Sequence, residues 1–519
     1  MKRTIYLLAF LWAFFGQLNA QFDMDIDFGG IERTSQVNSL IELESGQFLQ
    51  LSSHGKWNEK KKVLFRLFDE QLNWKRSVEA DVFYQPSKIS NDRKVFREIE
   101  VWGGKVYVFY MIYNPGNTFK LYAEELDQEM LQLSGKPILI GQFETKAAKD
   151  NTASYRIVKS HEENRMVFYV KETVKVENKL KTDHIQMVVL DESLNRLWQK
   201  AVFTPETGNR SNYLELTVNN VGEVFLLEQY LEGKFKFLES FSKKYAYTIH
   251  KFDARGTKRL AKDIDLEDRR TKRLSLRMTL NEELLVSGVF FTAEEGNGIA
   301  YIRFDTSTME LQAATFNLFD LEYIKEGLPK EELKYLMNQI DKGKGAFLPI
   351  TIRAFIPRPD GELIILGEKF TYEKVKPMFS DGKEFRQYKF GSTYILCLDA
   401  MGEFKWKKKI AKNQEINRDS RSSIRSPLHG EYAYASFTWA NQDDNIILFF
   451  NHLTRQEPSF DAVRIDEVGN MEREKIFNYK KKEMVIHPLR TRFLNKERTE
   501  LILIGLYKQK QRLAYLRLD

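Results

Sequence analysis

The sequence has very little cysteine and, after its first 20 residues, no long hydrophobic run. Cys397 is the only cysteine in 519 residues, so no internal disulfide can form. A secreted animal domain of this length would usually contain several disulfides, whereas a protein of a bacterial envelope does not need them. A transmembrane helix needs about 18 consecutive apolar residues, and no segment beyond residue 20 provides them. These absences predict a bacterial periplasmic or secreted protein without a transmembrane segment.

The short motifs of known catalytic and metal sites are also absent. The seven histidines form no H-x-H or H-E-x-x-H pair, which are the spacings typical of zinc sites. No G-x-S-x-G nucleophile elbow is present. Asp23, Asp25 and Asp27 begin like a calcium loop, but Phe28 and Thr34 occupy the positions that require Gly and Glu. We therefore expect no metal, no cofactor and, as the preferred interpretation, no enzymatic activity.

Isolated titratable residues have simple structural interpretations. Cys397 lies in an apolar run, so we expect a buried, unreactive thiol. His250 alternates within an expected strand and is predicted to face a surface or a neighbour. Acid pairs that precede apolar runs are predicted to form hairpin turns; they are Glu162-Glu163, Glu282-Glu283 and Asp443-Asp444. Carboxylates from different repeats can still meet in space, which spacing along the chain cannot show.

The positive and negative charges of the chain nearly balance. The 80 Lys and Arg residues oppose 73 Asp and Glu residues, which leaves a net charge of +7. The two signs are interspersed, as on an ordinary soluble surface. No nucleic-acid-binding module is recognisable, so we expect no nucleic acid partner.

The first 20 residues indicate export. Lys2-Arg3 precede an apolar run over residues 5–16, and Ala20-Gln21 offers a cleavage site. This is the order of a secretory signal peptide, and about 12 apolar residues are too few to cross a bilayer. We predict cleavage near Ala20-Gln21, followed by a single mature domain over residues 21–519.

One short sequence motif recurs along the whole chain. Eight times an apolar residue followed by Asp ends an apolar run. The Asp residues of these pairs are Asp69, Asp127, Asp191, Asp253, Asp305, Asp399, Asp466 and Asp519. Their intervals run from 52 residues (Asp253 to Asp305) to 94 residues (Asp305 to Asp399). A recurring unit of this size is typical of repeat architectures.

Each repeat has the pattern of several short strands. The run before each Asp alternates or is rich in β-branched and aromatic residues, as in residues 300–304, which indicates a strand. An earlier continuous apolar run, such as residues 222–227, suits a strand buried on both faces. The segment after each Asp is more polar, which suits an edge strand. Trp74, Trp198 and Trp406 lie in three of these outer segments.

Four short strands per repeat describe a blade of a β-propeller. Eight repeats predict an all-β, eight-bladed propeller, with seven blades as the alternative. The chain ends at Asp519, where the outer strand of the last repeat should follow, and Phe22–Phe28 alternates strictly. We predict that this N-terminal strand completes the last blade and closes the ring.

The longest interval contains an insertion, residues 316–345, for which a helix is predicted. Pro329 can begin a helix. Four apolar residues then share one helical face; they are Leu333, Leu336, Met337 and Ile340. We expect the helix to pack on the propeller rim, with a lid or docking site as the alternative.

Three polar segments are predicted to be long loops: residues 231–245, 370–390 and 412–431. The last of these, with the lysines before it, predicts a positive patch. The residues of this patch are Lys407, Lys408, Lys409, Arg418, Arg421 and Arg425. A patch of this kind attracts anionic glycans, lipid headgroups or peptides. A solvated loop without a ligand is the simpler interpretation.

The segment Leu398–Trp406 resembles a known repeat. Its apolar-Asp turn contains Gly402, and Trp406 follows four residues later. This is similar to the repeat of bacterial secreted β-propellers of the quinoprotein-like (PQQ-like) type. The resemblance implies an eight-bladed propeller. Quinoprotein dehydrogenases typically have a vicinal disulfide over the cofactor, which a single cysteine cannot form, so the resemblance implies no cofactor site here.

Together these features predict an exported, non-enzymatic propeller that acts as a binding or scaffold protein of the bacterial envelope. We expect a protein or glycan ligand at a propeller face, where loops commonly present binding residues. The alternative is a glycan-active enzyme, a hydrolase or lyase, which requires carboxylates, His or Tyr from several blades to converge. A quinoprotein oxidoreductase ranks last.

Overall fold

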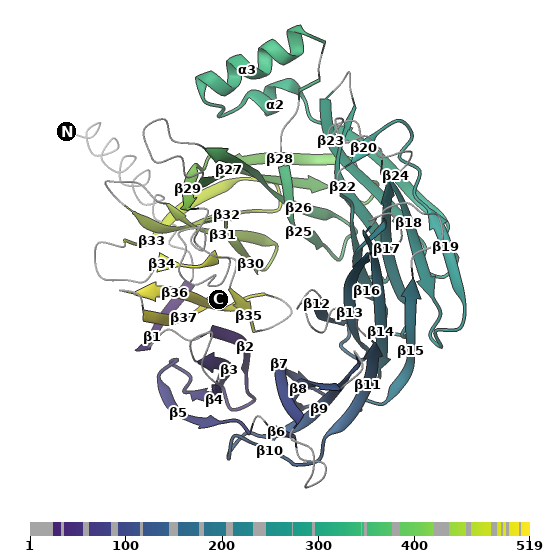
Figure 1. The fold of residues 1–519 in the computed structure, drawn as a ribbon. Coiled ribbons are helices and arrows are strands. Elements are labelled where there is room, and N and C mark those ends of the chain that lie inside the picture. The colour runs from purple at the N-terminus through teal and green to yellow at the C-terminus, as the bar shows by residue number, and fades with distance from the viewer. Residues whose placement is uncertain are drawn as a thin grey trace, which may run out of the picture.

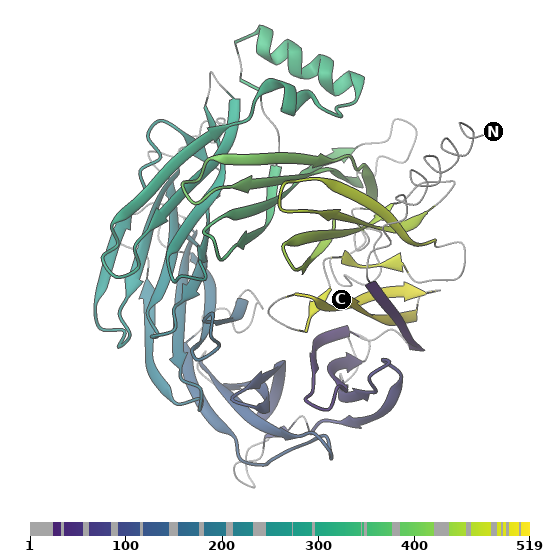
Figure 2. The same cartoon turned by 180° about the vertical axis from the view of Figure 1, so that it is seen from behind.

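Almost all regular structure in the computed structural model is β-strand. It describes residues 24–32, 36–54, 62–81, 83–84, 92–114, 118–144, 154–175, 181–203, 211–231, 245–271, 273–292, 296–343, 345–346, 350–375, 385–419, 435–452, 458–478, 485–488, 491–494, 498–507 and 510–518. The described strands form eight antiparallel sheets. Figures 1 and 2 show these sheets standing around one axis as the blades of a propeller. The predicted eight-bladed, all-β propeller is confirmed, and the seven-bladed alternative is wrong.

The first four blades follow one another along the chain. Blade 1 holds β2 (Gln36–Glu42), β3 (Phe48–His54), β4 (Lys62–Phe68) and β5 (Trp74–Glu79). Blade 2 holds β6 (Phe83–Tyr84), β7 (Asp92–Trp102), β8 (Lys105–Asn114), β9 (Thr118–Asp127), β10 (Gln132–Leu133) and β11 (Ile138–Glu144). Blade 3 holds β12 (Ser154–Lys159), β13 (Met166–Lys175), β14 (Lys181–Leu190) and β15 (Arg196–Phe203). Blade 4 holds β16 (Ser211–Val218), β17 (Val224–Leu231), β18 (Tyr245–Phe252) and β19 (Arg259–Asp263).

The last four blades complete the ring. Blade 5 holds β20 (Arg270–Thr271), β21 (Ser275–Met278), β22 (Leu284–Thr292), β23 (Gly296–Phe304) and β24 (Leu311–Leu318). Blade 6 holds β25 (Ile350–Pro357), β26 (Leu363–Val375), β27 (Phe385–Leu398), β28 (Phe404–Ile410) and β29 (Gln414–Asp419). Blade 7 holds β30 (Thr438–Gln442), β31 (Asn445–His452), β32 (Ser459–Ile465) and β33 (Met471–Asn478). Blade 8 holds β34 (Val485–Ile486), β35 (Arg492–Phe493), β36 (Glu500–Tyr507), β37 (Lys510–Leu518) and β1 (Met24–Glu32).

Burial decreases from the second strand of a blade to its outer strand. In blade 4 the second strand β17 is almost entirely buried, whereas every residue of the outer strand β19 is exposed. The core lies between blades, where for example Val167 of blade 3 and Leu226 of blade 4 share one apolar cluster. Full burial of such a side chain stabilises the fold by about 1.5–3 kcal/mol. The continuous apolar runs are therefore buried strands, as predicted.

The N-terminal strand closes the ring. β1 pairs antiparallel with β37, with Met24 opposite Leu518 and Phe28 opposite Ala514. Figure 1 shows the purple β1 beside the yellow strands of blade 8. The predicted closure is confirmed for Met24–Glu32, while Phe22 and Asp23 lie outside the described residues.

The recurring Asp caps the turn between the third and fourth strands of a blade. Asp69 Oδ1 accepts hydrogen bonds from the backbone N–H groups of Gln71 (3.0 Å) and Asn73 (2.7 Å). Equivalent bonds are accepted by Asp127, Asp191, Asp253, Asp305, Asp399 and Asp466. Asp side chains commonly bond to the backbone two residues on and so form turns. Asp519 lies outside the described residues.

Glycines in these turns allow close contact with the preceding blade. A Cβ atom on Gly256 would lie 2.7 Å from the Trp198 ring, and one on Gly469 would lie 2.9 Å from the Trp406 ring. Both glycines have a positive φ, 65° and 85°, which glycine adopts without steric cost. Trp198 and Trp406 belong to the outer strands of blades 3 and 6, as predicted. The Gly and Trp of the repeat therefore meet between blades.

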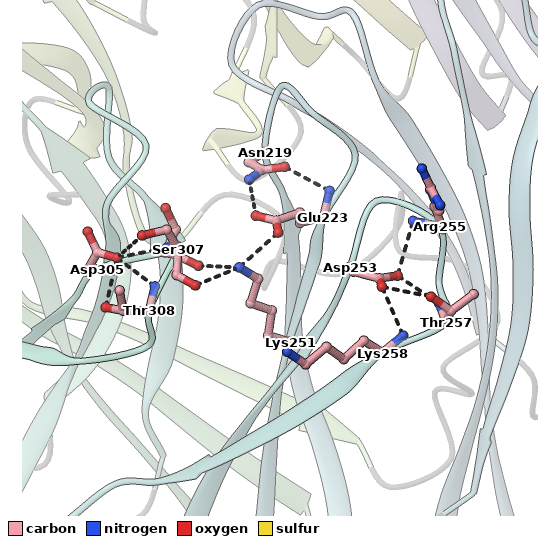
Figure 3. A network of polar contacts seen from close by, with 11 residues as sticks. Asn219, Glu223, Lys251, Asp253, Arg255, Thr257, Lys258, Asp305, Ser307 and Thr308 are labelled. Atoms are coloured by element: carbon pink, nitrogen blue, oxygen red, sulfur yellow. Dashed lines mark hydrogen bonds and ion pairs between the residues drawn. The ribbon is translucent and has the colours of Figure 1, made fainter.

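Charged side chains also connect neighbouring turns. Figure 3 shows Lys251 of blade 4, whose Nζ lies 2.8 Å from Glu223 Oε1 and donates a hydrogen bond to the Thr306 carbonyl at 2.6 Å. Thr306 belongs to the Asp305 turn of blade 5. Hydrogen bonds from Ser307 and Thr308 lower the pKa of Asp305 to about 2. The carboxyl group that caps the Asp305 turn thus remains charged at ordinary pH.

The insertion forms two helices, α2 (Leu321–Lys325) and α3 (Lys330–Asp341). The helical insertion was expected at roughly residues 316–345; β24 continues to Leu318, so the helical part begins at Leu321. Leu336 of α3 is buried, and Leu333, Met337 and Ile340 are half-buried, so the predicted apolar face is confirmed. Figure 1 shows the helices at the outside of the ring.

Two of the predicted loops are partly strand. Residues 370–375 and 385–390 extend the hairpin of β26 and β27. Residues 414–419 form β29, which pairs with Phe385–Phe390. The apolar pattern is weak there because these residues extend the hairpin beyond β28 and pair in a separate, outlying part of the sheet. The three acid pairs lie in turns, as predicted, whereas residues 232–244 lie outside the described residues.

Candidate functional site

The innermost strands of the blades surround the axis in Figure 1. Each innermost strand leads through a short connection into the second strand, as at residues 43–47 and 219–223. Because the strands are antiparallel, these connections lie at the same end of the propeller as the Asp turns. We call this end the turn face. Side chains near the ends of the innermost strands are therefore placed around the axis at the turn face.

Several innermost strands contain a β-bulge. The register of β7 shifts between Phe96 and Glu98, and that of β25 shifts between Ile352 and Ala354. The extra residues are Arg97 and Arg353. A bulge redirects the side chains around it and is common beside functional sites. The strands at the axis thus carry charged residues at irregular positions.

Charged and aromatic residues from three blades gather at the axis. We call this group the axial cluster: Arg97, Glu98 and Glu100 of β7, Tyr155 and Lys159 of β12, and Arg492 of β35. Lys159 Nζ lies 2.9 Å from Glu100 Oε2, and the Arg97 guanidinium lies 4.7 Å from the centre of the Tyr155 ring. Arg492 of blade 8 lowers the pKa of Glu98 of blade 2. Blade 1 stands between these two blades (Figure 1), so the cluster reaches across the ring.

Glu98 has the most altered chemistry of the axial cluster. Burial, followed by repulsion from Glu100, raises the pKa of Glu98 from 4.5 to about 7, and Arg492 and Lys159 oppose this rise. No described residue donates a hydrogen bond to the Glu98 carboxyl group or forms an ion pair with it. A carboxyl group with this pKa can accept or donate a proton near neutral pH.

A second group at the axis is built around an arginine. Arg498, just before β36, has its guanidinium carbon 4.0 Å from the centre of the Trp439 ring and 4.2 Å from that of Phe493. These are cation–π distances. Burial and the positive charge of Arg277 in blade 5 lower the pKa of Arg498 to about 10. We call Arg277, Trp439, Phe493 and Arg498 the arginine site.

Buried charges elsewhere have complete sets of partners. Glu368 of β26 is fully buried. It accepts hydrogen bonds from Arg353 and Ser436, each at 2.7 Å, and also pairs with Lys412. Buried charges are tolerated when they are paired and hydrogen-bonded in this way. This group is therefore part of the blade structure.

His250 is also held within its own blade. Its Nε2 lies 2.6 Å from Glu228 Oε2, and Arg259 Nη2 lies 2.9 Å from its Nδ1. His250 and Glu228 are buried. Of the two positions expected for His250, a surface or a neighbour, the structure shows the second.

The predicted basic patch is described in part. Lys407, Lys408 and Lys409 lie on β28 and Arg418 lies on β29, while Arg421 and Arg425 lie outside the described residues. Lys407 pairs with Asp320 at the start of α2. Lys409 is buried and donates hydrogen bonds to the carbonyl oxygens of Tyr323 and Glu326, each at 2.6 Å. A cation is favourable at the C-terminal end of a helix, so these two lysines attach the insertion to blade 6. Anion binding by this patch stays a prediction.

Other candidate chemistry is weak within the described part of the chain. No three His, Cys, Asp or Glu side chains of these residues are placed to hold a metal ion. Cys397 is buried, as predicted, and burial raises the pKa of its thiol to about 12. Neither described helix combines the length and the apolar character needed to cross a bilayer.

Sequence reasoning did not find the axial cluster or the arginine site. Glu98 and Glu100 stand two residues apart in a strand-like segment, and Arg492 stands 394 residues after Glu98. The only available signal was charge within innermost strands, which would otherwise be apolar. This signal does not show which blades face one another.

Comparisons with known proteins find no family and only distant structural similarity. No protein-family model and no curated protein matches the sequence. Among solved structures, the chain is similar to the WD40 domain of SCAP from fission yeast, with 8% identity, coverage of 96% of this chain and 98% of that chain, and a TM-score of 0.39. It is also similar to a europium-containing methanol dehydrogenase, with 10% identity, coverage of 96% and 95%, and a TM-score of 0.38. A third similar structure is the polysaccharide lyase Uly1, with 10% identity, coverage of 84% and 94%, and a TM-score of 0.34.

Proposed function

We propose that this protein is an exported, non-enzymatic propeller that binds a glycan at the turn-face end of its axis. The axial cluster offers a carboxyl group, a phenol, an ammonium group and two guanidinium groups in one place. Such groups provide the donors and acceptors that fix the orientation of a polar ligand in a binding site. Glycan hydroxyl groups match this mixture of donors and acceptors.

One observation supports the proposal above the others. Glu98 of blade 2 is half-buried, yet its carboxyl group forms no hydrogen bond or ion pair with a described residue. Partly buried polar groups in folded proteins nearly always have partners. We therefore infer that the missing partner of Glu98 is a ligand, which the exposed Arg492 of blade 8 can also contact.

The proposal is tested by calorimetric titration of the mature protein with a set of neutral and acidic oligosaccharides. We expect Glu98→Ala and Arg492→Gln each to weaken binding about tenfold or more, which corresponds to about 1.4 kcal/mol. Arg255→Gln is the matched control, because Arg255 is exposed on the turn face away from the axis. Binding that is equal in the wild type and both axial variants would contradict the proposal.

A glycan-active enzyme is the second candidate function, and the pKa of Glu98 favours it. A carboxyl group with a pKa of about 7 is suited to general acid or base chemistry. The test is to incubate each bound oligosaccharide with the protein and to measure new reducing ends and unsaturated products. Product formation that Glu98→Gln abolishes, while binding remains, would establish the enzyme. The absence of any product would support the non-enzymatic proposal.

Export and kinship with quinoprotein-like propellers belong to the same proposal. Residues 1–20 support export, and N-terminal sequencing of the protein recovered from the periplasm or medium should begin near Gln21. Gly402 and Trp406 support the kinship. The preferred interpretation includes no cofactor, so incubation with the quinone and calcium should produce no bound cofactor absorbance.

A further inference from the structure

Arg498 has unusual surroundings for an arginine. Its guanidinium packs against Trp439 of blade 7 and Phe493 of blade 8. The two ring centres are 6.0 Å apart, and the guanidinium lies about equally close to both, at 4.0 and 4.2 Å. A guanidinium carries five N–H donors, and no described residue accepts a hydrogen bond from those of Arg498.

Several other half-buried arginines have an acceptor. Arg353 lies 2.7 Å from Glu368 Oε2, and Arg303 lies 3.4 Å from Glu283 Oε2. Arg358 lies 3.7 Å from Asp444 Oδ1. The chain therefore provides partners for arginine where the role is structural, and Arg498 differs from that pattern.

The backbone at Arg498 is fixed by the neighbouring blade. Arg498 has a φ of 63°, in the left-handed region. Glu163, Glu282 and Asp443 have the same conformation in the corresponding turns of blades 3, 5 and 7, so it is a feature of these turns. The carbonyl of Arg498 accepts a hydrogen bond from the backbone N–H of Asn441 in blade 7 at 3.1 Å, which holds this turn beside Trp439.

Burial leaves the charge of Arg498 poorly compensated. Burial first, and then the positive charge of Arg277 in blade 5, lowers the pKa of Arg498. Arg277 itself is exposed and is paired with Glu215, so its own charge already has a partner. An anion beside Arg498 would stabilise its charge and would also accept its free N–H groups.

We propose that Arg498 binds an oxyanion group carried by the axial ligand. The planar fork of a guanidinium matches the paired oxygen atoms of a carboxylate, sulfate or phosphate group. This inference rests on the proposed glycan function for the source of the anion, and it narrows that ligand to an acidic glycan. The aromatic rings of Trp439 and Phe493 hold the guanidinium in place before the ligand arrives, which reduces the entropy lost on binding.

The first arm of the test uses inorganic sulfate and the mature full-length protein. Calorimetric titration at constant ionic strength should show saturable binding to the wild type. Arg498→Gln should weaken it at least tenfold, and Arg498→Lys should have an intermediate effect, because lysine keeps the charge but lacks the fork. Arg255→Gln should leave it unchanged. Far-ultraviolet circular dichroism and the Tm of each variant establish that the fold is retained.

The second arm uses an oligogalacturonate, a sulfated oligosaccharide and a neutral oligosaccharide of equal length. An acidic oligosaccharide that binds at least tenfold more tightly than the neutral one, with the difference lost in Arg498→Gln, supports the inference. Equal affinity for acidic and neutral sugars overturns the inference but leaves the glycan proposal standing. Sulfate binding that depends on Arg498, with no binding of any sugar, supports the anion site and contradicts the glycan proposal. Anion binding that is the same in wild type and Arg498→Gln overturns the inference.

Discussion

Two regions of this propeller, one buried and one half-buried, contain the same kinds of charged residues with and without hydrogen-bond partners. In blade 6, Glu368 is fully buried, and Arg353, Lys412 and Ser436 all donate to it. At the axis, Glu98 and Arg498 have no such donors or acceptors among the described residues. The difference shows that this fold can provide hydrogen-bond partners for a buried charge that is part of the blade structure.

The unsatisfied charges are therefore informative about function. A buried polar group without a partner costs about 1–3 kcal/mol, and more when it is charged. The axial residues lower stability relative to neutral residues of the same shape. Stability–function trade-offs of this kind are common at binding sites. The comparison predicts that substitutions in the two regions will have opposite effects on stability.

The largest effect is expected when β1 is removed, because this breaks the ring that holds both regions in place. Deletion of residues 21–34 removes the strand that pairs with β37 from Met24 to Glu32. Blade 8, which carries Arg492 and Arg498, would then lose its outer strand. We expect a loss of stability greater than for any single substitution, together with loss of axial binding.

This deletion is assessed by thermal unfolding and by circular dichroism of the purified protein. A Tm equal to that of the wild type would show that closure by β1 does not stabilise the propeller. Restoring the strand as a separate peptide of residues 21–34 should recover part of the lost Tm, which serves as the control.

The next largest effect is expected for Glu368→Gln in blade 6, which sharpens the comparison. This substitution leaves Arg353 and Lys412 without their carboxylate. Removing one partner of a buried ion pair destabilises a protein by about 3–5 kcal/mol. Unfolding in urea should show this loss at pH 8, while Glu129→Gln on the exposed turn face should change stability by less than about 0.5 kcal/mol. A loss below about 1 kcal/mol for Glu368→Gln would mean that the blade 6 network is not structural.

A smaller and opposite effect is expected for Glu98→Gln at the axis. The unfolded chain loses the Glu98 proton near pH 4.5 and the folded chain near pH 7. Between these values the folded state binds more protons than the unfolded state, so this residue makes stability fall as pH rises. Above pH 7 the full penalty is present, at about 1–2 kcal/mol after allowance for its partial exposure.

Glu98→Gln removes this penalty and its pH dependence. Urea unfolding should show the variant as stable as the wild type at pH 4.5 and more stable at pH 8. A variant that is less stable than the wild type at pH 8 would mean that the Glu98 carboxylate is paired in the folded protein.

The sequence was sufficient for the parts of the fold that depend on local chemistry. Asp69 bonds to residues two and four positions later, so its turn can be read from a short segment. The alternation in Phe22–Phe28 likewise predicted a strand that completes blade 8, and the structure places β1 at Met24–Glu32. The Gly and Trp signals were visible, but their contact between blades, as between Gly469 and Trp406, requires the ring to be known.

The candidate site could not be predicted, because it is created only when the ring closes. Glu98, Lys159 and Arg492 come from three blades, and each is unremarkable within its own strand. The contacts of the lysines of β28 also could not be predicted from the sequence. Lys407 and Lys409 were predicted to belong to an exposed basic patch. In the structure Lys407 pairs with Asp320, and Lys409 donates a hydrogen bond to the Tyr323 carbonyl of α2. Hydrophobic periodicity describes one strand at a time. It does not predict contacts between blades at the axis or between the insertion and blade 6.

The most direct test of the account is a carbon-13 NMR titration of the Glu98 carboxyl group in the ligand-free protein. Labelled glutamate supplies the signals, and Glu98→Gln identifies the one that belongs to Glu98. The account predicts a pKa of about 7, raised by burial and by repulsion from Glu100. A value at or below 4.5, the ordinary pKa of this group, would show that Glu98 already has a partner and would contradict the claim that the axis awaits a ligand.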